Sequence, residues 1–285
     1  MLQLLFVGLS QGCAYALVAI GFVFIYRATE IVNFAHGDLM MLGAFAVYTF
    51  VEIYGMNFWF GAILGLGTLA IFGYFLDAIV MRRVIGESQA SIFILTVALG
   101  FSFKALAGMT WGWEPLSLQT PFSGNLPIGD IALSMDRIAV IIGTVIICSI
   151  LFYFFSRTRT GIAIQASSQN QLAAYYMKVP VKKLVSLVWA IGAVVAAIAG
   201  VMMAPVTQVD TSIAAFGIKA LAGSVVGGFG SIPGAILGCL LIGVAEPFLD
   251  YLYPPFKGVY AYAIMLVVLF VKPEGLIPQT FQKKV

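Results

Sequence analysis

A few ionisable residues lie inside long apolar stretches, where any chemistry of this chain would be concentrated. His36 and Asp38 stand two residues apart at the start of one stretch, and Lys104 interrupts another. Lys219 and Glu246 flank a third, glycine-rich region. Charged groups in such places cap helices, pair with opposite charges, or act directly on a solute or a proton. For Asp38 we favour helix capping, and for His36 packing and a hydrogen bond across helices, over a direct gating or solute role. For Lys104, Lys219 and Glu246 we favour snorkelling outward or pairing with an opposite charge over a solute contact.

The signatures of enzymes are missing. The sequence has no GxxxxGK[ST] phosphate loop, no HExxH and no GxSxG, and His36 is its one histidine. The three cysteines stand singly in apolar runs, without the CxxC spacing of a metal site. We therefore predict that the chain is not an enzyme, with no catalytic residue and no metal or cofactor site of its own. A row of buried carboxylates, as in a proton relay, is also missing from the sequence.

Uncharged polar residues are better suited to lining a path for a solute. Gln11, Tyr15 and Asn33 fall near the first two apolar stretches. Such groups bind weakly, and a path that must release its cargo should bind it weakly. The sequence predicts these three, together with His36 and Asp38, as pathway or gating residues.

The composition identifies an integral membrane protein. Of the 285 residues 61% are hydrophobic and only 9% are charged, too few to cover a water-soluble globule of this size. A transmembrane helix needs about 20 apolar residues. We predict an all-α, polytopic bundle of about eight spans, with one or two broken or re-entrant helices, in a single transmembrane domain over 1–285. The predicted spans are Leu4–Tyr26, Gly37–Tyr54, Phe58–Val80, Ser91–Met109, Arg137–Phe155, Leu184–Pro205, an interrupted region Phe216–Leu249, and Gly258–Val271.

The loop charges predict the orientation. Segment 156–183 carries five basic residues and no acidic one, and Arg82 and Arg83 follow the third span. Short loops rich in Lys and Arg stay on the cytoplasmic side. The loop at Glu52 and segment 110–136 contain acidic residues but no Lys or Arg, so they are expected on the opposite, outer side of the membrane. This places the N-terminus outside and the C-terminus in the cytoplasm, and it explains the net charge of +3 without nucleic-acid binding.

The interrupted region must enter and return if the C-terminal lysines are to end inside. Its centre reads VVGGFGSIPGAILG, where glycines weaken a helix. Ser231 suits an N-cap and Pro233 a first helical turn. Irregular backbone at membrane depth is tolerated where it is buried in protein or faces a water-filled cavity. Phe229, Ser231 and Pro233 are therefore predicted pathway or gating residues.

The same spacing recurs near the start of the chain. Phe34 precedes Gly43 by nine residues, as Phe229 precedes Gly238, and each pair brackets a polar break and an apolar helix. Transporters are often built from two related halves with discontinuous helices in matching places. A degenerate internal repeat is one interpretation, and chance is the other.

The basic segment contains a short amphipathic helix. Gln169–Val179 reads QNQLAAYYMKV, which places apolar residues on one face, and Pro180 is expected to end it. Such a helix either docks in a groove of a soluble partner or rests on lipid. The predicted docking residues are Gln169, Asn170, Leu172, Ala173, Ala174, Tyr176, Met177 and Lys178.

Several stretches, in order along nearly the whole chain, resemble one known family. They are AYALVAIGFVFIY from Ala14, IVNFAHGDLMMLGA from Ile31, RTRTG from Arg157, and GIKALAGSVVGGFGSIPGAILGCLLIGVAE from Gly217. In these stretches the chain resembles the permease subunits of ABC importers for branched-chain amino acids and related amides or urea. The most specific parts of this resemblance are NFAHGD and GGFGSIPGA.

This resemblance implies a set of partners and a location. They are two cytoplasmic ABC ATPase subunits that use the ATP, a second permease subunit that is a paralogue, an extracytoplasmic solute-binding protein, and the lipid of a bacterial inner membrane. It also implies that segment 156–183 carries the coupling helix. The sequence departs from the family pattern there, with Gln171 for Pro, Leu172 for an acidic residue and Lys178 for Gly. The alternative function is a self-sufficient secondary transporter or channel.

Overall fold

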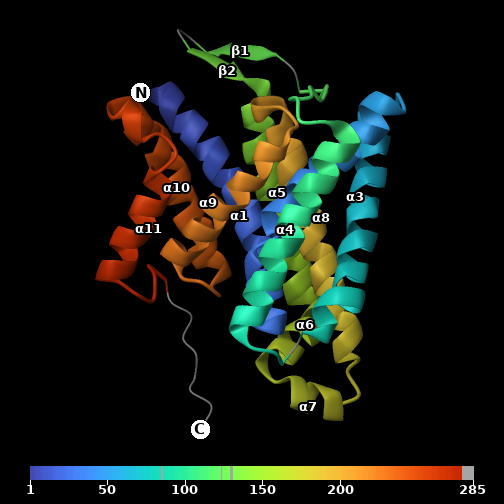
Figure 1. The fold of residues 1–285 in the computed structure, drawn as a ribbon. Coiled ribbons are helices and arrows are strands. Elements are labelled where there is room, and N and C mark those ends of the chain that lie inside the picture. The colour runs from blue at the N-terminus through green and yellow to red at the C-terminus, as the bar shows by residue number, and fades with distance from the viewer. Residues whose placement is uncertain (85, 123, 129–130, 278–285) are drawn as a thin grey trace.

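A computed structural model describes residues 1–84, 86–122, 124–128 and 131–277 (Figure 1). The chain folds into a helical bundle with a small strand pair at one end. The elements are α1 (Leu2–Thr29), α2 (His36–Tyr48), η1 (Thr49–Ile53), α3 (Phe58–Phe75), η2 (Leu76–Val80), η3 (Met81–Arg83), α4 (Gln89–Trp111), β1 (Asn125–Ile128), β2 (Ile131–Ser134), α5 (Met135–Arg157), α6 (Arg159–Gln169), α7 (Gln171–Tyr176), α8 (Val181–Thr207), η4 (Thr211–Ile213), α9 (Ala214–Gly227), α10 (Ile232–Leu252), η5 (Pro254–Phe256) and α11 (Tyr260–Val271).

The predicted fold class is confirmed. Within the described residues, six helices are long and apolar enough to cross a membrane: α1, α3 with η2 and η3, α4, α5, α8 and α10. The shorter apolar helices α9 and α11 complete the predicted set, together with α2, which continues into the π-helical turn η1. One feature was not predicted: β1 and β2 form an antiparallel pair in the loop expected outside the membrane.

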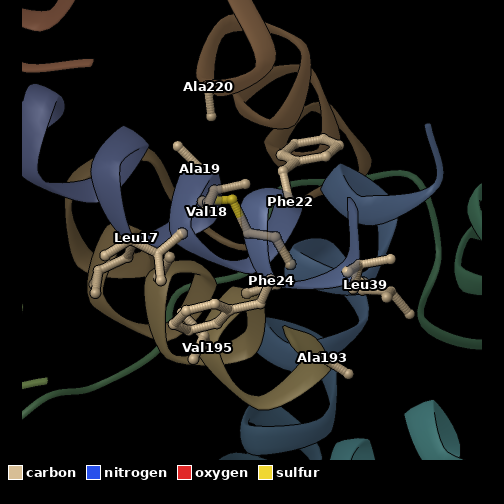
Figure 2. Close-up of a cluster of buried hydrophobic side chains, with 14 of the residues drawn as sticks. Leu17, Val18, Ala19, Phe22, Phe24, Leu39, Ala193, Val195 and Ala220 are labelled. Atoms are coloured by element: carbon tan, nitrogen blue, oxygen red, sulfur yellow. The ribbon is translucent and has the colours of Figure 1, made fainter. Parts of the chain in front are cut away.

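Two helices form the centre of the bundle. In α8 and α1, 78% and 67% of the most apolar window is buried, against 22–33% in α3, α4 and α5. A helix that is apolar on every side and buried belongs in the core, whereas α3, α4 and α5 present most of their side chains outward. Figure 2 shows side chains of α1, such as Leu17 and Phe22, meeting Val195 of α8 and Ala220 of α9.

Glycines allow the central helices to approach closely. A methyl group added at Gly8 of α1 would lie 2.7 Å from the carbonyl oxygen of Gly243 in α10. Helices α9 and α10 are equally close. Gly223 of α9 lies against Cys239 of α10, and Gly227 lies against the main chain of Gly234. Small residues at such contacts allow dispersion to hold helices together in lipid. Pairs of glycines four residues apart therefore lie at the α1–α10 and α9–α10 contacts, namely Gly8/Gly12, Gly223/Gly227 and Gly234/Gly238.

The two ends of the bundle differ. The N-terminus and the β1–β2 pair lie at one end, and α6 and α7 lie at the other (Figure 1). Leu116 bridges to Val209, which ties the first of these ends to the segment that follows α8. The predicted outer and cytoplasmic loops thus fall at opposite ends. Asp130, Lys283 and Lys284, which also entered the orientation prediction, lie outside the described residues.

Candidate functional site

The interrupted region is a helical hairpin, as predicted. Helix α9 ends at Gly227, and α10 begins at Ile232 and packs back against it. Between them, Gly228 and Gly230 have φ angles of +113° and +100°, which L residues with a side chain rarely adopt. The Ser231 hydroxyl accepts a hydrogen bond from the Gly234 N–H at 3.2 Å, so it caps α10, and Pro233 lies in the first turn.

This break, residues 228–231, is held from two sides. The Arg27 side chain, at the end of α1, donates from Nε to the Gly230 carbonyl at 2.7 Å. The main-chain N–H groups of Leu276 and Ile277 donate to the carbonyls of Val226 and Gly227, each at 2.9 Å. Helix ends leave carbonyls without partners, and here distant segments of the chain supply the donors.

An apolar groove runs along α9 to this break. Its volume is about 350 Å³, it is open on one side, and its exposed lining among the described residues is entirely apolar. Phe34 and Phe229, the two aromatic residues of the repeat spacing, both line it. We call it the Phe34–Phe229 groove. Its other walls are Val32, Ile218, Leu221, Ala222 and Val225, with Tyr262 and Met265 from α11.

The first break, residues 30–35 before α2, is less fully bonded. The Asn33 side chain is buried, and its Oδ1 accepts from the Ala35 N–H at 3.2 Å, while Nδ2 has no hydrogen-bond partner among the described residues. The His36 ring is fully buried against Phe22, with ring centroids 4.6 Å apart. The main chain of Val18 is near, yet neither ring nitrogen meets hydrogen-bond geometry with a described group. The hydrogen bond of His36 across helices therefore stays a prediction, with the main chain of Val18 in α1 as its candidate partner.

Asp38 lies in the first turn of α2, where its carboxylate is near its own main-chain N–H, while the N-cap position is held by Ala35. The Asp38 carboxylate packs against Gly100 of α4 and lies within electrostatic reach of Lys104, one turn further along that helix. These two described side chains do not form a salt bridge, so the pairing of Lys104 with a carboxylate stays a prediction. Gln11 of α1 is half-buried, and its Oε1 has no hydrogen-bond partner among the described residues.

Tyr15 does not face an open pathway. Its side chain is completely buried, and its hydroxyl donates to Glu246 of α10 at 3.0 Å. The other carboxylate oxygen of Glu246 accepts from Lys219 of α9. The side chains of Lys219 and Glu246 are 20% and 4% exposed. The three residues form a buried network that joins α1, α9 and α10, which confirms the structural interpretation of Lys219 and Glu246 and removes Tyr15 from the pathway set.

Asp77, inside the protein, pairs with Arg82. Its side chain is fully buried, and Oδ2 accepts from the Ser186 hydroxyl at 2.6 Å and from Arg82 at 3.3 Å. Arg82 also donates to the Lys182 carbonyl at 3.1 Å. These bonds fasten the end of α3 and its extension to the start of α8, directly after the basic segment.

The basic segment contains two helices, not one. The Asn170 side chain caps α7 by accepting from the Ala173 N–H at 3.0 Å. Ala173 is exposed, but Ala174 is only 6% exposed and faces inward. The most exposed side chains are Tyr175, Tyr176 and Met177, of which the sequence prediction missed Tyr175. Gln169, Asn170 and Lys178 are also exposed, and the Leu172 side chain lies outside the described part.

Comparison with known proteins identifies the family of this chain. The family model described as "Branched-chain amino acid transport system / permease component" matches residues 4–270. The chain belongs to this family. BraD of Pseudomonas aeruginosa, a high-affinity branched-chain amino acid transport system permease protein, is 30% identical over all of this chain and 98% of its own length. LivH of Escherichia coli, which bears the same description, is 28% identical over all of this chain and 97% of its own length.

A solved structure shares the fold of this family member. The structure titled "PsaBC from Streptococcus pneumoniae in complex with Fab" superposes with a TM-score of 0.51. The match covers 94% of this chain and 91% of the other, at 18% identity. This likeness establishes a common arrangement of helices.

Main-chain hydrogen bonds end α7. Lys178 has a φ of +60°, and its N–H donates to the Tyr175 carbonyl while the Val179 N–H donates to that of Ala174. This is a Schellman motif, whose left-handed position usually holds glycine. The helix therefore ends before Lys178 by its own main-chain bonds, and Pro180, predicted to end it, instead precedes α8.

Proposed function

We propose that this chain is the membrane permease subunit of a binding-protein-dependent ABC importer that moves branched-chain amino acids or a related small polar solute. Membership of the permease family supports this role, and the names of BraD and LivH support the solute class. The ATP would be hydrolysed by separate cytoplasmic subunits. The second permease, a paralogue, would complete the pathway, and a loaded solute-binding protein would dock outside.

The observation that carries the proposal is the surface of α7. Tyr175, Tyr176 and Met177 are 70–79% exposed at the end of the bundle opposite the N-terminus. They stand in a segment that carries five basic residues and no acidic one, at the end of the bundle that the charges predict to be cytoplasmic. Aromatic residues and methionine are enriched at protein interfaces. A soluble subunit that changes shape with ATP could push on the bundle through this contact.

The charges and the two ends of the bundle support an orientation. With the basic segment in the cytoplasm of a bacterium, the N-terminus and the β1–β2 pair lie outside the inner membrane. We propose that the C-terminus lies in the cytoplasm.

The test is transport by proteoliposomes that contain the assembled importer. We expect leucine uptake that requires ATP, the ATPase subunits and the loaded solute-binding protein. Uptake driven by an ion gradient and unaffected by ATP would contradict the proposal and favour a secondary transporter.

A substitution on α7 tests the docking surface. Ala174→Arg would disturb the inward packing of the loop, so the exposed Tyr176 gives a cleaner result. Tyr176→Arg should lower affinity for the ATPase subunits by about 2 kcal/mol or more, as at an interface hot spot, while leaving the permease inserted. Tyr176→Phe is the matched control, and it should keep most of the affinity. Wild-type affinity in Tyr176→Arg would place the contact elsewhere.

A further inference from the structure

The Phe34–Phe229 groove lies between the two breaks in the helices. Val32 and Phe34 come from the segment before α2, and Phe229 comes from the turn between α9 and α10. In transporters, substrate sites form where helices are discontinuous. The groove therefore occupies the place in this fold where a solute would meet the protein within the membrane.

The apolar lining of the groove favours aliphatic groups over charged ones. Aliphatic and aromatic groups make up its exposed surface among the described residues, and one wall is the α9 face formed by Ile218, Leu221 and Val225. A surface of this kind holds an aliphatic group by removing it from water, at about 0.8 kcal/mol per CH₂ group. It offers nothing to an ammonium or a carboxylate.

The size and the open side of the groove fit part of a small solute. Ligand pockets commonly measure about 300–1,000 Å³, and this groove, at about 350 Å³, is at the lower end. Because it is open along one side, it can take the side chain of an amino acid while the charged groups stay outside the apolar lining. Contact of this limited kind allows the solute to leave again.

We propose that the Phe34–Phe229 groove holds the aliphatic side chain of the transported amino acid, so that the permease itself distinguishes solutes by side-chain size. The inference rests on the proposed function and adds to it. Selection by a solute-binding protein comes first, and the groove adds a second, weaker discrimination during passage.

The experiment compares solutes of different size in the assembled importer. Initial uptake of leucine and of alanine is measured with the solute-binding protein saturated by each in turn, and the leucine-to-alanine ratio is the readout. Val225→Phe narrows the groove, and Met265→Ala widens it. Val267→Phe is the matched control, because Val267 is 63% exposed on α11 and does not line the groove. ATP hydrolysis stimulated by the solute-binding protein reports whether each variant is assembled.

We expect the ratio to fall about threefold in Val225→Phe, to rise in Met265→Ala and to stay unchanged in Val267→Phe. A change of about threefold is smaller than the roughly tenfold of a closed hydrophobic pocket, because this groove is open. An unchanged ratio in both groove variants would overturn the inference and favour lipid or the second permease as the occupant. If Val225→Phe does not assemble, the smaller change Val225→Leu decides by the same ratio. Failure of the wild-type importer to take up leucine with ATP would contradict the proposed function instead.

Discussion

The two helix breaks of this protein differ in how completely their polar groups are bonded. At the break between α9 and α10, Arg27 donates to the Gly230 carbonyl, and Leu276 and Ile277 donate to the last carbonyls of α9. At the break before α2, Asn33 and His36 are buried with nitrogens that have no hydrogen-bond partner among the described residues. Buried polar atoms are normally bonded, so the exceptions need an explanation.

This difference indicates which break keeps its hydrogen-bond partners and which break can exchange them. A break whose carbonyls accept hydrogen bonds from distant segments loses those bonds if it moves, so the α9–α10 break serves as a rigid part of the frame. A break with spare donors and acceptors can gain bonds, from water, a solute or a shifted helix, when the bundle rearranges. We infer that α2 and the segment before it change partners during transport while the α9–α10 hairpin keeps its own.

The largest effect should come from forcing the fixed break apart. A side chain at Gly227 would overlap the main chain of Gly234, whereas Gly67 of α3 has nothing within 4 Å of its added carbon. Gly227→Val should therefore yield no folded protein in detergent extracts, because backbone cannot yield as a flexible side chain can. Gly67→Val should purify as the wild type does. Size-exclusion chromatography of both variants makes the comparison, and a well-folded Gly227→Val would show that the hairpin is not rigid.

The next effect concerns the other attachment of the hairpin, the Lys219–Glu246 pair. Lys219→Met leaves the carboxylate of Glu246 buried with Tyr15 alone, and breaking a buried pair costs about 3–5 kcal/mol. The double variant Lys219→Met with Glu246→Gln removes the stranded charge and should recover most of that loss. The free energy of unfolding in mild detergent measures both. If the single and double variants lose the same free energy of unfolding, the two charges contribute nothing to stability and only the packing of the side chains does.

A smaller loss is expected where α1 holds the break. Arg27→Met keeps the length of the side chain but removes the hydrogen bond to Gly230, and bonds from charged groups contribute about 1.5–3 kcal/mol. Arg83→Met is the control, because Arg83 is exposed at the same end of the bundle. The measurement is again the free energy of unfolding. Equal stabilities of the two variants would remove Arg27 from the set of contacts that fix the break.

The sequence predicted much of the fold but little of this bonding. Hydropathy places the spans, because each helix must satisfy its own main chain in lipid. Glycines and Ser231 likewise mark the α9–α10 break, because their effects are local. The Tyr15–Glu246 bond joins residues 231 positions apart, and no periodicity reports such a pair.

The sequence also did not reveal which side chains of the site are exposed, because tertiary contacts decide this as well. On α7, spacing placed Ala174 on the docking face, but this residue is buried and Tyr175 is exposed. A helix of six residues has too few turns for its pattern to fix which side faces the protein. Tertiary contacts decide that orientation, and they also bury Asp77 beside Arg82 and Ser186.

The smallest effect on stability, with the opposite sign, should occur at the first break. His36→Leu removes two buried ring nitrogens without hydrogen-bond partners and keeps an apolar group in their place. The free energy of unfolding should stay the same or rise by up to about 1 kcal/mol, since unbonded buried polar atoms are costly. Uptake should nevertheless fall, because the variant can no longer form the bonds that a moving α2 would offer. Tyr15→Phe is the matched control: it removes a bonded hydroxyl from another fully buried ring and should lower stability. If His36→Leu destabilises the protein as much as Tyr15→Phe does, His36 is fully bonded, and the first break is as fixed as the second.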